Sequence, residues 1–239
     1  MRSWPQAILF DLYETLVSEF DPAWTPQPSL AAARLGVEEA AFAAAWRHVY
    51  AQRMTGTIPD FPAALHAICQ RLGSTPNAAV IAQLHRERLA AKARPFTGIA
   101  VSIVGLIQRL HAMSIKLGVL SNVAREEGAA WEACALAPFF DTVVFSYQVG
   151  RMKPDPQVYW LACERLGTTA ADTLFVGDGG SDELVGAARA GLTAYWAQWF
   201  FVQWPAEKRP ASWRERAARF PALPTPEALL HRLNAAHAP

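Results

Sequence analysis

Carboxylates stand where apolar runs of the chain end, and they are the residues best suited to chemistry. Asp11 follows the run "AILF", and Asp178 follows "LFVG". A carboxylate at the tip of a strand can be a nucleophile, a metal ligand or a structural cap. Asp182 comes four residues after Asp178, across Gly179 and Gly180, whose small size lets backbone approach a ligand closely.

Other polar residues complement these acids. Ser121 and Asn122 end another apolar run and offer a hydroxyl, an amide and backbone N–H groups suited to an anionic oxygen. Lys153, which precedes Pro154, supplies a positive charge. If these strand ends converge, three carboxylates and one lysine share a small site, where like charges raise one another's pKa unless a cation neutralises them. Oxygen ligands in this number suit a hard ion, and we predict Mg²⁺.

The elements that must position these residues alternate between strands and helices. A short buried strand is expected at 6–10. After residue 95 the expected strands are 115–122, 141–146, 172–177 and 192–197. The expected helices are 99–113, one between 122 and 141, one that follows a loop within 153–167 and ends at Gly167, and 184–191. Such alternation predicts an α/β fold with a doubly wound, Rossmann-like parallel sheet. Sheets of this kind bind ligands at the carboxyl ends of their strands.

The segment before Pro95 has a different pattern. Amphipathic helices are expected at 31–35, 38–54, 60–71 and 77–92, without a convincing strand. The change predicts an α/β core at 1–17 and 96–239 and a small inserted helical cap at 18–95. The tail from Trp199 reads as packing and a terminal helix near 226–234. Its tryptophans are candidates for an interface, and no oligomeric state follows from the sequence.

Composition narrows the class of protein. The chain has 239 residues, of which 52% are hydrophobic, enough for a large domain with an insertion. A net charge of +1 implies no bulk attraction to nucleic acid or to an anionic membrane. The three cysteines are odd in number and without CxxC spacing, as in a reducing compartment. With no signal-peptide pattern and no run long enough to span a bilayer, we expect a soluble cytoplasmic protein.

Four motifs carry a resemblance to a known family. "FDLYETL", "VLSN", "KPDP" and "VGDGGSDE" resemble, in order and spacing, the motifs of the haloacid dehalogenase (HAD) superfamily. The match covers 6–16 and 97–197, and the helical insertion resembles that family's small cap. The resemblance implies that Asp11 is a nucleophile that forms a covalent aspartyl intermediate, oriented by Lys153.

The resemblance also implies binding roles. Ser121 and Thr15 would hold the nucleophile and the phosphate. Mg²⁺ would be held by Asp11, Asp178, the backbone carbonyl of Tyr13 and, through water, Asp182. The residues expected to bind substrate are Thr15, Asn122, Tyr13 and Arg47.

Two branches of the superfamily compete for this sequence. Its phosphatases usually carry a second Asp two residues after the nucleophile, whereas its 2-haloacid dehalogenases carry tyrosine, as here at Tyr13. Arg47 and Tyr159 also resemble dehalogenase residues that face the substrate. Gly177 and Asp178 stand where the dehalogenases, which need no metal, carry neutral serine and asparagine.

We give the fourth motif more weight. A phosphate that approaches Asp11 is repelled and needs a metal with its ligands, whereas extra carboxylates only repel a monoanionic haloacid. The sequence therefore favours a Mg²⁺-dependent phosphatase of small phosphate esters. The alternatives are a metal-independent 2-haloacid dehalogenase and a catalytically weak phosphate-binding protein.

Overall fold

A six-stranded sheet organises the molecule. The computed structural model describes residues 5–19, 31–204, 215 and 217–235. The strand order is β3-β2-β1-β4-β5-β6, and neighbouring strands are parallel. The strands are β1 (Ala7–Phe10), β2 (Lys116–Ser121), β3 (Thr142–Phe145), β4 (Thr173–Gly177), β5 (Thr193–Ala197) and β6 (Ala222–Leu223). The expected α/β parallel sheet is confirmed.

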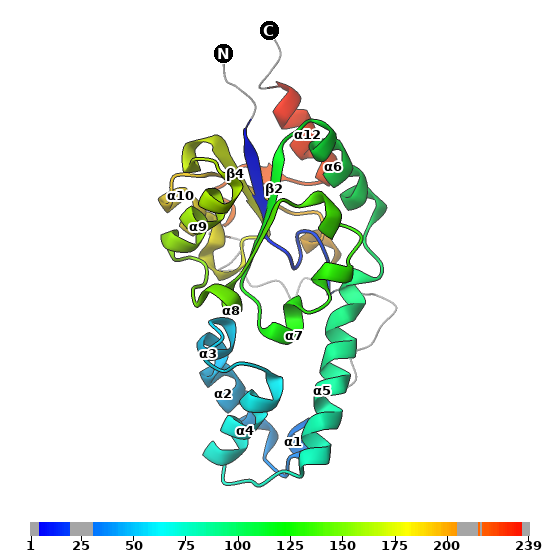
Figure 1. The fold of residues 1–239 in the computed structure, drawn as a ribbon, viewed down its shortest axis with the longest axis vertical. Coiled ribbons are helices and arrows are strands. Elements are labelled where there is room, and N and C mark those ends of the chain that lie inside the picture. Colours follow the sequence, from blue (N-terminus) through cyan, green and yellow to red (C-terminus); the bar gives the residue numbers. More distant parts are fainter. Residues whose placement is uncertain (1–4, 20–30, 205–214, 216, 236–239) are drawn as a thin grey trace.

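Helices cover both faces of this sheet (Figure 1). Helices α6 (Val101–Ala112) and α12 (Pro226–Ala235) pack on one face, and α9 (Pro156–Leu166) and α10 (Glu183–Arg189) pack on the other. The short strand β1 shows why the sheet needs two covers. Its alternate side chains belong to different hydrophobic clusters, Phe10 to the α6 side and Leu9 to the α9 side.

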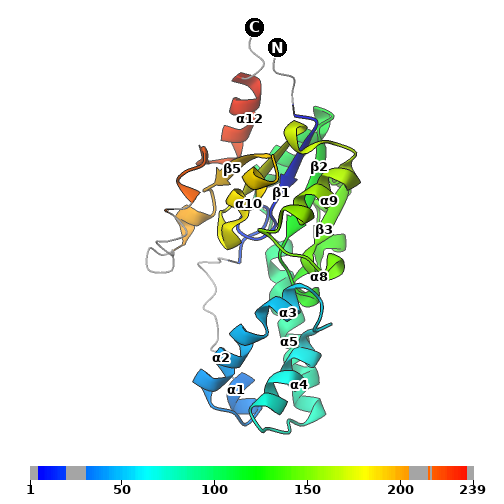
Figure 2. The same ribbon diagram turned by 90° about the vertical axis from the view of Figure 1, so that its left-hand side faces the viewer.

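The helices of the first part group at the end of the molecule away from α12 (Figures 1 and 2). They are α1 (Ala31–Arg34), α2 (Glu39–His48), α3 (Tyr50–Met54), α4 (Phe61–Arg71) and α5 (Ala78–Ala93). Asp60 caps α4 as expected, because its carboxylate accepts from the Ala63 N–H at 2.8 Å. The group buries a hydrophobic cluster of its own, including Leu65 and Ile81. We keep 18–95 as the proposed extent of the cap.

Short helices fill the connections around the strand ends. They are α7 (Arg125–Gly128), α8 (Ser146–Val149) and the 3₁₀ turns η1 (Arg94–Phe96), η2 (Trp131–Ala133), η3 (Ala137–Phe139), η4 (Ala170–Asp172), η5 (Gly180–Asp182) and η6 (Phe201–Gln203). Helix α7 follows β2 and packs against α5 of the cap. The connection after β2 therefore lies between the sheet and the cap.

Three expectations differ from the structure. The helix expected at 38–54 is two helices, because the backbone of Val49 leaves helical geometry between α2 and α3. The tail contains the strand β6, which the sequence analysis missed. Trp199 is buried and Trp204 is half-buried, so neither is an exposed interface residue. Residues 20–30 and 205–214, which fall in the predicted cap and tail, lie outside the described residues.

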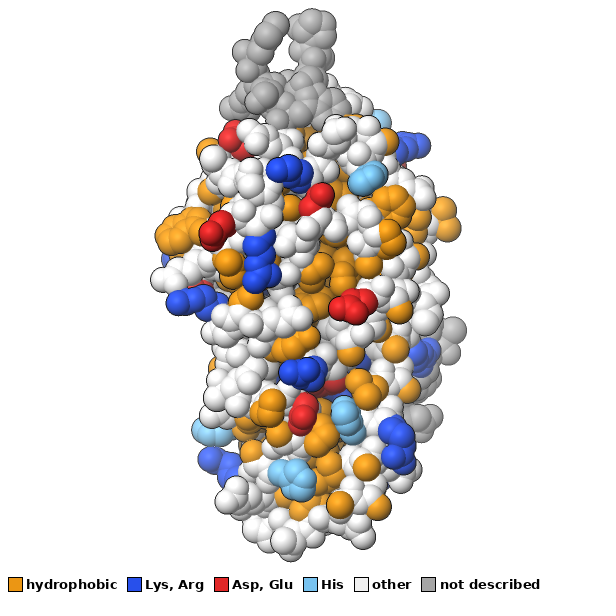
Figure 3. All heavy atoms as spheres, viewed as in Figure 1, with side chains coloured by type: hydrophobic (Ala, Val, Ile, Leu, Met, Phe, Trp, Pro, Cys, Tyr) orange, Lys and Arg blue, Asp and Glu red, His pale blue; other side chains and the backbone are white. Residues whose placement is uncertain are grey.

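Surface and helix composition complete the description. On the face in Figure 3, basic and acidic side chains intersperse over the described residues, in keeping with a net charge of +1. Among these residues no single helix is long and apolar enough to cross a membrane. One pair, 78–96 and 101–112, reaches that length and composition only together, across a bend of 66°.

Candidate active site

Three of the predicted site residues lie at the ends of neighbouring strands, at one edge of the sheet. Strand β1 lies between β2 and β4, and all three are parallel. Asp11 directly follows β1, Ser121 ends β2 and Asp178 directly follows β4. All three side chains are at least nine-tenths buried, and the Ser121 hydroxyl donates to Asp11 Oδ1 at 3.1 Å. The convergence expected from the sequence is therefore present in the structure.

Lys153 is the cation at the centre of this edge. It is 2% exposed, and its ammonium group donates to Asp11 Oδ1 at 2.5 Å and to Glu183. Burial alone would lower the pKa of Lys153, but the carboxylates of Asp11 and Glu183 raise it above its ordinary value. Lys153 is thus a permanent positive charge at neutral pH.

Asn122 supports the backbone of Lys153. Its Nδ2 donates to the Lys153 carbonyl at 2.9 Å, and its Oδ1 accepts from the Lys153 N–H at 2.7 Å. Both ends of its amide bond to the backbone of Lys153, and substrate binding by Asn122 stays a prediction. Its contribution is to hold the loop that presents the lysine.

Three buried carboxylates come together beside the lysine. Oxygen atoms of Asp11, Asp178 and Glu183 all lie within 4.8 Å of one another. Asp178 accepts from the Gly180 N–H at 2.9 Å, and Glu183 accepts from the Gly179 N–H at 2.9 Å. These backbone bonds orient both acids toward Asp11. Buried hard oxygen donors in this arrangement fit Mg²⁺.

The third member of the carboxylate group is Glu183, whereas the sequence analysis expected Asp182 there. Ser181 and Asp182 both have left-handed backbone conformations, with φ of 54° and 53°. Asp182 lies outside the group of three carboxylates and lines a small pocket with Ala217 and Phe220. One residue further along, Glu183 opens α10 and points back to the sheet. A sequence pattern shows the acids but not which of two neighbours the turn brings inward.

Gly177 makes room for this glutamate. A Cβ atom at Gly177 would lie 2.2 Å from Glu183 Oε1 and 2.7 Å from Glu183 Cδ. A serine at this position would therefore force the Glu183 carboxylate to move. The position of the Glu183 carboxylate therefore depends on a glycine at residue 177.

Charge imbalance shifts the acids in the same direction. Burial first, then the charges of Glu183 and Asp11, raises the pKa of Asp178 well above its ordinary value. Burial and Asp11 raise the pKa of Glu183 to about 7, against the lowering effect of Lys153. Burial is the main cause of both shifts, and the neighbouring carboxylates, which one lysine does not neutralise, add to it.

Tyr13 points to the cap side of the site. Its hydroxyl donates to the Glu127 carbonyl at 2.8 Å, and its ring packs edge-on against Phe96 with centroids 6.1 Å apart. Burial, followed by the charge of Glu19, raises the pKa of the Tyr13 phenol. A phenol with a raised pKa, committed to a backbone carbonyl, is a poor proton donor to a leaving group.

Thr15 remains placed to meet a ligand. Its side chain is fully buried, and its hydroxyl has no hydrogen-bond partner within the described part of the chain. A buried hydroxyl without a partner costs about 1–3 kcal/mol, so an anionic oxygen in reach would be favoured. Its backbone carbonyl accepts from Trp199 at 2.9 Å.

A family model now bears on this geometry, since the model for haloacid dehalogenase-like hydrolases matches residues 5–191. The chain belongs to this family. Among curated relatives, the glyceraldehyde 3-phosphate phosphatase of Methanopyrus kandleri is 28% identical over 138 residues, which cover 56% of this chain and 57% of the relative. Human N-acylneuraminate-9-phosphatase is 33% identical over 81 residues, 34% of this chain and 33% of the relative. The chain thus spans from about a third to just over half the length of these relatives.

The solved structures extend the likeness to the whole fold. A 2-haloacid dehalogenase from Pseudomonas syringae pv. Tomato DC3000 superimposes with a TM-score of 0.60, 20% identity and coverage of 97% of this chain and 99% of that one. At this identity the likeness concerns the fold. This HAD-like hydrolase therefore has relatives named phosphatases and structural neighbours named dehalogenases.

The two residues that resemble substrate-facing dehalogenase positions have opposite surroundings in this HAD-like hydrolase. Arg47 is exposed on α2. Tyr159 is fully buried, packs edge-on against Phe175 and donates to the Glu183 carbonyl at 2.7 Å. Tyr159 therefore supports the carboxylate group through the backbone of Glu183.

The cap sends other cations toward the core. Arg53 on α3 is 4% exposed, lies 3.6 Å from the Trp46 ring centre and pairs with Glu126 at 3.3 Å. Arg88 on α5 pairs with Glu127 at 2.6 Å. No motif spacing marks these pairs in the sequence, because each joins segments that are distant along the chain.

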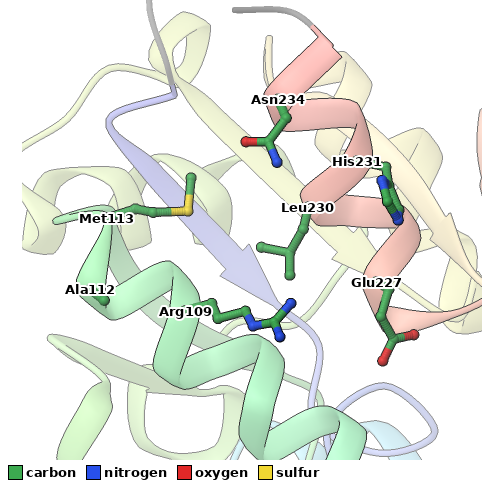
Figure 4. Close-up of a pocket in the computed structure, with 7 residues that line it drawn as sticks. All are labelled: Arg109, Ala112, Met113, Glu227, Leu230, His231 and Asn234. Atoms are coloured by element: carbon green, nitrogen blue, oxygen red, sulfur yellow. The ribbon is translucent and has the colours of Figure 1, made fainter.

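A cavity of about 330 Å³ lies away from this chemistry, between α6 and α12 (Figure 4). It is lined by Arg109, Ala112, Met113, Glu227, Leu230, His231 and Asn234. It includes none of the predicted site residues, so we place the candidate active site at the sheet edge on chemical grounds.

Proposed function

We propose that this HAD-like hydrolase is a Mg²⁺-dependent phosphatase of small-molecule phosphate esters that acts through an aspartyl-phosphate on Asp11. The observation that carries the proposal is the approach of three buried carboxylates to within 4.8 Å beside one lysine. A metal-free site of this kind holds excess negative charge, which a divalent cation relieves. The ion's ligands would come from Asp11, Asp178 and Glu183, with the Tyr13 carbonyl as a further candidate.

The same carboxylates argue against haloacid chemistry. A 2-haloacid is a monoanion, and Asp178 and Glu183 would repel it without assisting departure of the halide. A phosphate ester carries more negative charge, but bound Mg²⁺ would neutralise it and polarise its oxygens. The similarity to two phosphatases of small phosphate esters supports this preference.

The first half of the reaction forms the covalent bond. The hydrogen bonds that Ser121 and Lys153 donate to the Asp11 carboxylate both fall on Oδ1, so we expect Oδ2 to attack phosphorus. The phosphorus–oxygen bond to the leaving group breaks, and that oxygen takes a proton from water. Lys153 holds Asp11 in place and offsets charge in the transition state, while Ser121 and Thr15 donate hydroxyl hydrogens to Asp11 or the phosphoryl oxygens.

The second half restores the enzyme. Water attacks the phosphorus of the acyl phosphate, its bond to Asp11 breaks, and inorganic phosphate leaves. The carboxylate of Asp11 is regenerated with Lys153 still paired to it.

Tyr13 is expected to favour substrates with good leaving groups. The phenol bonds to Glu127, so no side-chain acid at this position assists the leaving oxygen. We therefore expect aryl and acyl phosphates to react faster than alkyl phosphates, by up to about 10²–10⁴-fold. Turnover of an aryl and an alkyl phosphate tests this, and equal rates would refute the bias.

Tyr13→Asp is expected to raise alkyl phosphatase activity, whereas no gain would contradict this account of Tyr13.

A panel of phosphate esters and 2-haloacids, assayed with Mg²⁺ and with chelator, tests the function itself. Metal-dependent phosphate release is the expected result. Halide release in chelator would favour the dehalogenase, which Tyr13 motivates. Binding of beryllium fluoride and Mg²⁺ without turnover on any substrate would favour a phosphate-binding protein. We keep the cytoplasm as the expected location, since the three cysteines are free and buried.

A further inference from the structure

Three tryptophans on one short segment donate their indole N–H groups to the loops that carry the site. Trp196 on β5 donates to the Asp178 carbonyl at 2.9 Å. Trp199, just beyond β5, donates to the Thr15 carbonyl at 2.9 Å. Trp204 donates to the Glu14 carboxylate at 2.7 Å. Segment 196–204 thus contacts both the loop that follows the nucleophile and the loop that carries the metal-site acids.

The sheet gives this segment a rigid base. Trp196 pairs in register with Gly177, the residue before Asp178, and its backbone N–H donates to Pro221 at 3.0 Å. Its ring packs edge-on against Phe201 with centroids 6.0 Å apart. Trp196 and Trp199 are 7% and 6% exposed, so both indoles have fixed surroundings.

The loops they contact need restraint. Glu14 has a left-handed backbone with φ of 57°, a conformation that disfavours a residue with a side chain. The other loop carries Asp178 and Glu183. Their negative charges repel each other and that of Asp11 before a metal cation binds. The bonds from Trp196 and Trp199 end on backbone carbonyls, so they act whatever the charge of the acids.

We infer that Trp196 and Trp199 are positioning residues that preorganise the two halves of the site, with Trp204 anchoring the first loop through Glu14. Trp196 holds the Asp178 backbone where its carboxylate can serve Mg²⁺. Trp199 holds the loop of Thr15 beside the nucleophile. The inference rests on the proposed function, because it assigns these tryptophans to a metal-loaded site.

Mg²⁺ affinity without substrate tests the role of Trp196. Trp196→Phe keeps an aromatic ring and removes the N–H donor. Trp160→Phe is the matched control. Trp160, on α9, also donates its indole N–H to a backbone carbonyl, that of Ala190 at 2.9 Å. Ala190 follows the C-terminal end of α10, whereas the site lies at the N-terminal end of that helix. By calorimetry we expect Trp196→Phe to bind Mg²⁺ about fivefold more weakly than wild type, and Trp160→Phe to bind it unchanged.

Kinetics separate positioning from general damage. In Trp196→Phe, saturating Mg²⁺ is expected to restore kcat to within about twofold of wild type, since the ion then holds the loop. In Trp199→Phe, kcat is expected to stay about fivefold low at any Mg²⁺ concentration, because the Thr15 loop is not held by the ion.

The outcomes distinguish this inference from the proposed function. A wild-type chain that binds no Mg²⁺ overturns both. A wild-type chain that binds Mg²⁺, with Trp196→Phe no weaker than Trp160→Phe, overturns the inference alone. If Trp196→Phe does not fold, the rate of amide hydrogen exchange in Trp199→Phe tests the inference instead. Amides of residues 12–17 are expected to exchange at least about fivefold faster than in Trp160→Phe, and equal rates overturn the inference.

Discussion

Two groups of paired charges in this molecule differ in their balance. The site cluster consists of Asp11, Asp178 and Glu183 around Lys153. The cap–core cluster joins three cations of the cap to two acids of the core and one of the cap: Arg53, Arg88 and Lys92 with Glu126, Glu127 and Glu19. The first has three carboxylates for one cation, and the second has three of each.

The same side chain responds oppositely in the two clusters. Glu183 is buried in the site cluster, where its pKa rises to about 7. Burial alone would also raise the pKa of Glu127, but Lys92, Arg88 and Arg53 hold it below its ordinary value. A carboxylate paired with enough cations stabilises the fold, whereas a buried carboxylate with too few cations is a candidate ligand for a metal ion.

Removing the nucleophile is expected to have the largest effect. Asp11→Asn removes the attacking oxygen, and phosphate release is expected to fall about 10³-fold or more. Asp60→Asn is the matched control, because asparagine also caps a helix and Asp60 lies in the cap. Protein denatured during turnover of a radiolabelled phosphate ester should retain label in wild type and not in Asp11→Asn. Label retained by the variant would place the nucleophile elsewhere.

The strand ends could be predicted from the sequence, for a physical reason. Parallel strands buried on both faces read as short apolar runs, and their carboxyl ends meet at one edge whatever the details of packing. Asp11, Ser121 and Asp178 are therefore predictable from local pattern alone. Lys153 is predictable from its motif, and the structure places its ammonium group against Asp11.

The rest of the site depends on geometry that local pattern does not carry. The choice between Asp182 and Glu183 turns on two left-handed residues in one tight loop. The strand β6 is two residues long and exists because β5 offers it an edge. Arg53 meets Glu126 across 73 residues of chain, so only the tertiary structure makes them a pair.

Breaking the balanced cluster is expected to cost stability. Arg53→Met keeps much of the volume and removes the charge, which leaves Glu126, 2% exposed in its side chain, with Arg88 alone. We expect a loss of about 3 kcal/mol in the free energy of unfolding, since a buried charge that loses its partner is strongly unfavourable. Urea denaturation measures it. The double variant Arg53→Met/Glu126→Gln should recover part of the loss. If Arg53→Met alone were as stable as wild type, the pair of Arg53 with Glu126 would contribute nothing to the free energy of unfolding.

The unbalanced cluster should make the metal-free protein sensitive to pH. The pKa of Glu183 is 4.5 when unperturbed and about 7 in the folded chain, so the folded state binds this proton more tightly. Stability is then complete below about pH 4.5 and falls by up to about 3 kcal/mol as the pH rises through about 7. The raised pKa of Asp178 acts in the same direction.

Urea midpoints in chelator, at about pH 5 and about pH 8, measure this slope. Saturating Mg²⁺ is expected to remove most of it, because the ion binds the ionised carboxylates. A metal-free protein that is equally stable at both pH values would contradict the assigned charge imbalance.

The neighbouring acids Asp182 and Glu183 allow a direct comparison within one loop. Glu183→Gln is expected to weaken Mg²⁺ binding by at least about tenfold, since an amide replaces a charged ligand. Asp182→Asn makes the same chemical change one residue away, outside the group of three, and should alter affinity by less than about twofold. Calorimetry on both variants measures the difference. The reverse order of effects would restore the assignment made from sequence.

The smallest effect is expected where charges pair in solvent. Arg34 and Glu87 approach to 2.7 Å, closer than Arg53 and Glu126 at 3.3 Å, but their side chains are 26% and 51% exposed. Water and salt screen such a pair, so a double-mutant cycle with Arg34→Ala and Glu87→Ala should give a coupling below about 1 kcal/mol. The coupling should also fall at high salt, whereas that of Arg53 with Glu126 should change little. If the exposed pair proved as strong as the buried one, distance and not burial would govern the energy of charge pairs in this protein.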